Sequence, residues 1–174
     1  MGAMPLIYLV RHGIAEGRPA GGRDEDRALT QAGTANMQVA AAGLTWLAVK
    51  PDAIWSSPLL RARQTAEILR DALAPGLEIA IEARLRPEAD VDAMLEGLQA
   101  TAASQALMLV GHEPNISALA SALLTGDVSG ARVPFKPGSV IALDQTLPPA
   151  GRGSLHWFLT PDQLRRLGER AATA

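Results

Sequence analysis

Short apolar runs alternate with longer amphipathic stretches along most of the chain. A short apolar run bounded by turn residues is typical of a buried strand, whereas apolar residues that recur every three or four positions indicate one face of a helix. The apolar runs predict strands at residues 6–10, 53–56, 77–81, 106–110, 139–143 and 154–158.

The stretches between these runs carry helical stripes of apolar residues. Thr30 is the expected N-cap of the first helix, and Thr160 with Gln163 predicts a capping box at the last, with Pro161 at the first helical position. The stripes of the first four helices comprise Met37, Ala40, Leu44 and Leu47, then Ala62, Ala66, Leu69 and Leu73, then Val91, Leu95 and Leu98, and finally Ile116, Ala120 and Leu123.

The alternation of strands and helices over the whole length predicts an α/β domain with a largely parallel sheet. A chain of 174 residues suits one domain rather than two. We therefore expect a single domain over residues 1–174, with its core at about residues 5–168. The first apolar run begins at Leu6 with no basic segment before it, which argues against a secretory signal and favours a cytoplasmic protein.

Composition and charge exclude several classes of function. Sixteen basic and eighteen acidic residues give a formal net charge of −2, which offers no basic field for nucleic acid or a membrane surface. The lack of cysteine excludes disulfides, thiolate chemistry and cysteine-bound zinc. The three histidines show no metal-ligand spacing, so we expect neither a metal nor another cofactor. Only Lys50 and Lys136 among the basic residues are lysines.

Polar residues with catalytic potential follow three of the predicted strands. Ligands of open α/β sheets collect outside the carboxyl ends of the strands, and these ends carry Arg11-His12-Gly13, residues 56–61 and residues 111–114. Singly, a histidine after a strand is most often structural, and an arginine on a first helical turn is most often solvated. Arg61, however, is expected behind an N-cap at Ser57, where the helix dipole disfavours a cation by about 0.3–1 kcal/mol unless an anion binds there. Together these features predict a phosphate-sized anion site.

The same residues resemble a known family. Residues 9–13 (Leu-Val-Arg-His-Gly) resemble the first motif of the histidine phosphatase superfamily, the phosphoglycerate mutase-like proteins; residues 57–66 resemble its second motif and residues 110–112 its third. Residues 111–114 (Gly-His-Glu-Pro) and 157–161 are similar to the SixA-type branch, the bacterial phosphohistidine phosphatases. The resemblance implies a three-layer α/β/α fold with a largely parallel central sheet.

The resemblance also implies a reaction and its residues. The chain would be a phosphatase that works through a phosphohistidine enzyme intermediate, acting on phosphohistidine in proteins. His12 would be the nucleophile, and its ring must be neutral to attack. Arg11 and Arg61 would disfavour its protonated form and, with His112, would bind the phosphoryl oxygens. The partner would be a phosphorylated protein or a small phosphorylated substrate.

One departure from the superfamily bears on the substrate. Branches that cleave alkyl phosphate esters carry a glutamate after the third strand, but Pro87 stands at the matching position, with Glu88 and Asp90 out of step. An alkoxide has a conjugate acid close to water, with a pKa of about 15.7, whereas that of imidazole is about 6.5. A phosphoimidazole can leave without a donated proton, so the missing acid favours phosphohistidine over a sugar phosphate. Glu88, Asp90 and Glu16 are candidates for activating water or donating a proton.

Other interpretations stay open. The same residues would serve a broad small-molecule phosphomonoesterase of the superfamily, or a phosphate- or phosphohistidine-binding module without turnover. Residues 17–27 carry three arginines and three acids and are expected to form a solvated loop, with the rim of the pocket as the alternative. His156, alone in the last predicted strand, is expected to be structural.

Overall fold

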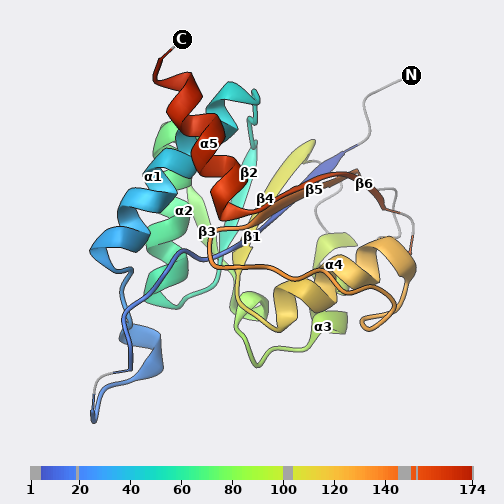
Figure 1. The fold of residues 1–174 in the computed structure, drawn as a ribbon. Helices are drawn as coiled ribbons and strands as arrows, with labels where there is room; N and C mark the ends of the chain where they lie inside the picture. Colours follow the sequence, from blue (N-terminus) through green and yellow to red (C-terminus); the bar gives the residue numbers. More distant parts are fainter. Residues whose placement is uncertain (1–4, 19, 100–103, 145–149, 152, 174) are drawn as a thin grey trace.

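The computed structural model describes residues 5–18, 20–99, 104–144, 150–151 and 153–173 (Figure 1). Its strands are β1 (Leu6–Arg11), β2 (Ala53–Ser56), β3 (Ile79–Ile81), β4 (Ala106–Gly111), β5 (Val140–Asp144) and β6 (Ser154–Leu159). Its α-helices are α1 (Gln31–Trp46), α2 (Leu60–Leu73), α3 (Val91–Gln99), α4 (Asn115–Thr125) and α5 (Pro161–Ala171). Two short 3₁₀ helices, η1 (Asp24–Asp26) and η2 (Ala83–Leu85), lie in connecting segments.

The strands form one sheet in the order β3-β2-β4-β1-β5-β6. The pairs β2–β3, β2–β4 and β1–β4 are parallel, and β5 runs antiparallel to both β1 and β6. The largely parallel sheet predicted from the strand–helix alternation is therefore confirmed. The β3 strand begins at Ile79 rather than at the predicted residue 77, because Leu77 packs beside the helical layer as a turn residue whose N–H bonds to Ala74.

Helices cover both faces of the sheet. Figure 1 shows α1, α2 and α5 on one side and α3 and α4 on the other. Alternate residues of each central strand enter the two cores, as the two-residue period of a strand requires. Tyr8 and Val10 pack with α1, α2 and α5, whereas Ile7 and Leu9 pack with α3 and α4. The three-layer α/β/α architecture is confirmed.

Two predicted helix starts are confirmed and one is wrong. The Thr30 hydroxyl accepts the Gly33 N–H at 2.8 Å, and Thr160 forms the capping box with Gln163. Ser57, however, does not cap α2, which begins only at Leu60 and has Leu59 as its N-cap without a side-chain bond. The Ser57 hydroxyl is directed to a histidine of the sheet edge instead.

Candidate active site

The pairing of β1 with β4 brings two histidines together at the carboxyl edge of the sheet. Arg11 lies opposite Gly111 in parallel register, so His12 and His112 leave adjacent strands at the same level. The His12 N–H donates to the carbonyl of Gly111 at 3.1 Å, and the two imidazole centroids are 4.9 Å apart. Residues that are 100 positions apart in the sequence thus share one site.

His12 is held as a neutral ring with a free lone pair. Its Nδ1 lies 2.6 Å from the carbonyl oxygen of Gly13, which can only accept, so Nδ1 carries the proton and Nε2 carries the lone pair. The Nε–H of Arg61 points at that Nε2 from 3.3 Å. Burial, together with the charges of Arg61 and Arg11, lowers the pKa of His12 to about 4. At neutral pH the ring is therefore uncharged, and its Nε2 carries a lone pair.

His112 is buried and has one ring nitrogen without a protein partner. Its Nε2 lies 2.8 Å from the Ser57 hydroxyl, which also accepts the Leu59 N–H. When this hydroxyl, which accepts from Leu59, donates its own hydrogen to Nε2, the neutral ring carries its proton on Nδ1. That Nδ1 is buried and has no hydrogen-bond partner in the described part of the chain. Burial and the neighbouring His12 lower the pKa of His112 to about 3.

Arg61, on the first turn of α2, is buried, and one edge of its guanidinium is occupied. Its Nη1 donates to the carbonyl of Asp24 at 2.8 Å, and its Nη2 donates to the Asp24 carboxylate at 2.9 Å. These bonds use the outer edge of the guanidinium, so the inner edge, formed by Nε–H and the second hydrogen of Nη2, faces His12. A planar fork of this kind suits two oxygens of a phosphoryl group.

Arg11 approaches the site from the end of β1. Its Nη1 donates to the carbonyl of Phe135 at 2.6 Å, which fixes the guanidinium against the segment before β5. Its Nε is buried and has no hydrogen-bond partner in the described residues. Burial lowers the pKa of Arg11 from its ordinary value, while the nearby Glu113 raises it.

These four side chains lie together as a candidate anion site. Buried polar groups are normally hydrogen-bonded, and the two orphaned ones here, the Nε of Arg11 and the Nδ1 of His112, both belong to the cluster. Two neutral imidazoles and two guanidiniums give the cluster a net positive charge. An anion with several acceptor oxygens satisfies both the charge and the free hydrogens.

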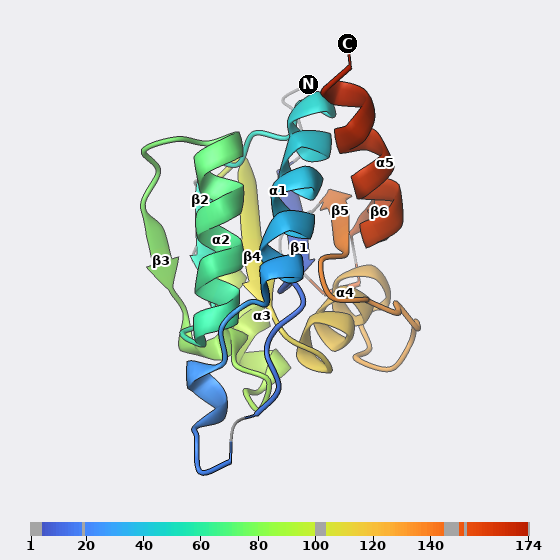
Figure 2. The same ribbon diagram turned by 60° about the vertical axis from the view of Figure 1, so that its left-hand side comes forward.

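Asp24 is a site residue that the sequence analysis did not single out. It lies in η1, which Figure 2 shows beside the first turn of α2. Arg27 and Arg61 hold the pKa of the Asp24 carboxyl below its ordinary value, so this group is an anion at neutral pH. The contacts of Asp24 with Arg61 favour the alternative given for this segment, the rim of the pocket, while Asp26 is exposed. Only the acidic charge of this segment hinted at the contact, because nothing local marks its distant partner.

The three acids expected near the reaction lie elsewhere. Glu88 is exposed and bonds to Arg86 at 3.2 Å. The Asp90 carboxylate accepts the backbone N–H of Asp92 at the start of α3, a helix-capping contact. Glu16 is exposed and meets Arg27 only through its backbone carbonyl. Within the described residues, none of the three contacts the cluster through its carboxylate.

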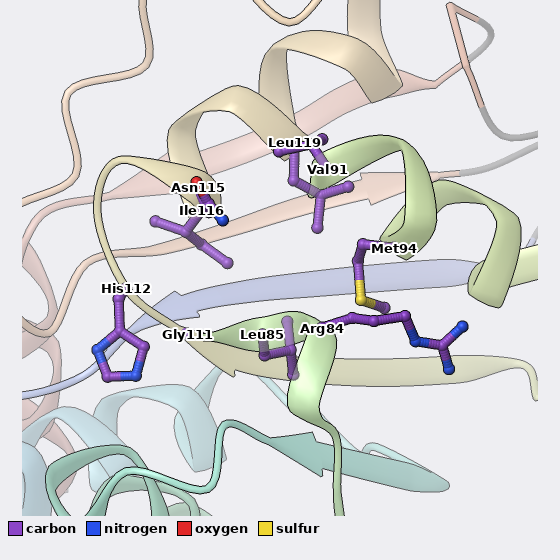
Figure 3. Close-up of a pocket in the computed structure, with 9 residues that line it drawn as sticks. All are labelled: Arg84, Leu85, Val91, Met94, Gly111, His112, Asn115, Ile116 and Leu119. Carbon is purple, nitrogen blue, oxygen red and sulfur yellow. The ribbon is translucent and has the colours of Figure 1, made fainter. Parts of the chain in front are cut away.

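A small apolar cavity lies behind His112. Figure 3 shows the imidazole at one end of the cavity, whose walls come from η2, α3 and α4, including Leu85, Met94 and Ile116. Its volume is about 10 Å³, room for roughly one water molecule. The apolar side chains on this face keep the ring of His112 out of solvent, which is the main cause of its lowered pKa.

Within the described part of the chain, no group of three or more histidine, aspartate or glutamate side chains is arranged to hold a metal ion. None of the helices there has the length and apolar character needed to cross a bilayer. His156, expected to be structural, lies 3.1 Å from the Asp144 carboxylate on β5 and is exposed.

Two histidines and two arginines at the carboxyl edge of an α/β sheet are typical of a protein that transfers phosphoryl groups. Comparison with known proteins identifies the family. The model of the histidine phosphatase superfamily (branch 1) matches residues 7–92. An uncharacterized protein of Picosynechococcus is 37% identical over 140 residues, covering 79% of this chain and 83% of that protein. Phosphohistidine phosphatase SixA of Escherichia coli is 29% identical over 161 residues, covering 91% of this chain and 96% of SixA.

Solved structures agree. The structure of SixA complexed with tungstate superimposes with a TM-score of 0.82 at 25% identity and covers 91% of this chain and 99% of that one. The putative phosphohistidine phosphatase SixA of Agrobacterium tumefaciens gives a TM-score of 0.78 at 30% identity and covers 92% and 100%. The chain belongs to the histidine phosphatase superfamily, with its similarity in the SixA-type branch. It is a phosphatase that uses a histidine nucleophile.

The fold by itself does not define the substrate. A putative alpha-ribazole-5'-P phosphatase of Escherichia coli shares it with a TM-score of 0.70 at 18% identity, covering 92% of this chain and 98% of that one.

Proposed function

We propose that this protein hydrolyses phosphohistidine in proteins and that His12 carries the phosphoryl group between the two half-reactions. The observation that carries this proposal is the state of His12: its Nδ1–H is committed to Gly13, and its Nε2 lone pair faces the Nε–H of Arg61. A phosphoryl group bound on the inner edge of Arg61 lies in front of that lone pair.

In the first half-reaction, Nε2 of His12 attacks phosphorus and the P–N bond of the substrate breaks. The electron pair of that bond goes to the substrate ring, which leaves as neutral imidazole because its other nitrogen has taken a proton from solvent. Arg11, Arg61 and the Nδ1–H of His112 donate to the phosphoryl oxygens as their negative charge shifts. In the second half-reaction, water attacks phosphorus and loses a proton to solvent, the electron pair returns to Nε2, and inorganic phosphate leaves.

The charge state of Asp24 supports phosphohistidine as the substrate class. An alkyl phosphate needs a proton donor for its alkoxide, a contribution of about 10²–10⁴ in rate. Asp24 contacts Arg61 in the cluster, and its two arginine partners keep it ionised, so it has no proton to give. A protonated phosphoimidazole ring needs no such donor. The similarity to phosphohistidine phosphatase SixA points the same way.

A substrate panel tests the proposal. Without added metal, the purified protein should hydrolyse a phosphohistidine peptide about 10²-fold or more faster, in kcat/KM, than phosphoserine or sugar phosphate substrates. Comparable rates on alkyl esters would instead identify a broad small-molecule phosphomonoesterase. Tight vanadate binding without hydrolysis of any phosphoramidate would identify a binding module.

The nucleophile is tested separately. His12→Ala should abolish turnover, and labelling quenched at alkaline pH should lose the acid-labile phosphoryl adduct expected on His12 of the parent protein. His156→Ala is the matched control, because this exposed histidine lies on β6 and bonds to Asp144. Full activity of His12→Ala would refute the assignment.

A further inference from the structure

Two clefts open beside the end of β1, where the phosphoryl site lies. The larger has a volume of about 710 Å³ and lies between the start of α4 and residues 128–136. The smaller, of about 240 Å³, lies between α1 and residues 136–138. Arg11 lines the larger cleft and Gly13 the smaller, and Lys136 lines both.

The segment between the clefts is bonded directly to the cluster. The Phe135 carbonyl accepts from Arg11, and the Gly138 N–H lies 3.0 Å from the Arg11 carbonyl and 3.1 Å from that of His12. The Phe135 ring packs edge-to-face on Phe158, with centroids 5.3 Å apart, under the larger cleft. This cleft therefore shares Arg11 with the phosphoryl site, and two packed aromatic rings line it.

The chemistry of the larger cleft favours a chain that is apolar and acidic. Its lining includes several apolar residues, among them Val128, which is 44% exposed. Lys136 and Arg132 on its rim are exposed, and neither side chain has an ion pair in the described structure. The one carboxylate that lines it, Glu113, is already bonded by the Ser117 hydroxyl at 2.6 Å. The smaller cleft is lined by both Lys136 and the acidic residue Asp162.

We propose that the larger cleft binds the polypeptide segment that flanks the phosphorylated residue, with apolar side chains over Phe135 and Phe158 and an acidic side chain at Lys136 and Arg132. This rests on the proposed function, since it assumes a polypeptide substrate. The volume supports it: pockets of about 300–1,000 Å³ hold ligands far larger than a phosphoryl group. Because Arg11 lines this cleft and also belongs to the phosphoryl site, a segment bound there is joined to the site through Arg11.

A charge reversal at Lys136 tests the surface. The probes are two phosphohistidine peptides that share leucines beside the histidine and carry either glutamates or lysines, and phosphoramidate as a substrate without a polypeptide. The parent should prefer the glutamate peptide, with a KM about tenfold lower. Lys136→Glu should reverse that preference and leave kcat and phosphoramidate hydrolysis within about twofold of the parent.

The chain supplies a matched control in its only other lysine. Lys50 is exposed and precedes β2, at the opposite edge of the sheet from the site. Lys50→Glu makes the same change in net charge and should keep the parent's preference. A second variant, Ala118→Trp, adds bulk in the larger cleft from α4 and should raise KM for both peptides but not for phosphoramidate.

The outcomes separate the two proposals. A parent that hydrolyses both peptides equally well, or a Lys136→Glu variant that keeps the parent's preference, overturns the docking surface and leaves the proposed function standing. An equal loss on phosphoramidate also overturns it, because the effect would then lie in the chemistry. A parent that hydrolyses neither phosphohistidine peptide refutes the proposed function itself.

Discussion

The site has two parts that are built in different ways. His12 and His112 follow paired parallel strands and are held by main-chain contacts, including the bond from the His12 N–H to Gly111. Residues 24–27 are held over Arg61 mainly by side-chain ion pairs of Asp24, and Glu25 bonds to Arg86. Strand pairing fixes a position by register, whereas a partly exposed ion pair such as that of Glu25 with Arg86 contributes only about 0–1 kcal/mol. The strand ends therefore hold the histidines in fixed positions. Residues 24–27, the covering segment, are held less firmly and are suited to adjusting the position of Arg61.

The largest effect should come from removing a side chain that donates hydrogen bonds to the phosphoryl group, either Arg61 on the first turn of α2 or His112 at the end of β4. Arg61→Ala should lower kcat/KM on a phosphohistidine peptide by about 10²–10³, or about 3–4 kcal/mol of transition-state stabilisation. His112→Ala should act similarly, because its Nδ1–H is the matching donor across the site. Steady-state kinetics of these two variants should be compared with those of Arg63→Ala, which removes an exposed arginine from the same helix, α2. Near-parental kcat/KM in both variants would contradict the anion site.

A smaller effect is expected from the covering segment. Asp24→Asn keeps the shape but weakens the charge-assisted bond to Arg61, and kcat/KM should fall about tenfold. Because Asp24 acts through Arg61, the substitution should have little further effect in the Arg61→Ala background, and this double-mutant cycle measures the coupling. Asp26→Asn, in the same 3₁₀ helix, and Glu88→Gln should match the parent. Additive losses in the cycle would show that Asp24 does not work through Arg61.

A third difference concerns pH and is read in stability rather than in activity. The folded-state pKa values of His12 and His112, about 4 and about 3, lie below the ordinary value of 6.5. As the pH falls below 6.5, the unfolded chain takes up protons that the folded protein excludes, so the free energy of unfolding should fall from pH 6.5 towards 4. Urea denaturation across this range should show a shallower dependence in His112→Asn than in the parent. His156→Asn, at an exposed position, should keep the parent's slope, and an equal slope in all three proteins would contradict buried neutral rings.

Much of the fold could be predicted because its signals are local. Apolar runs predicted β2 with its observed bounds, and Thr30 and Thr160 cap helices by contacts within three residues. Local signals failed where a side chain forms its hydrogen bond with a residue far away in the sequence. Ser57 has the residue type of an N-cap, yet its hydroxyl lies against the ring of His112, 55 positions away, and α2 starts later.

The sequence by itself determined that an α/β sheet carries histidines and arginines just beyond its strands, because burial periodicity and helix caps depend on neighbours within a few residues. Only the tertiary structure decided that β1 lies next to β4, so that His12 meets His112, and that Asp24 rather than Glu88 reaches Arg61. Such contacts depend on which strands pair and how loops pack across them. Local sequence does not distinguish the segments that could occupy those positions, so the packing of the whole chain selects among them.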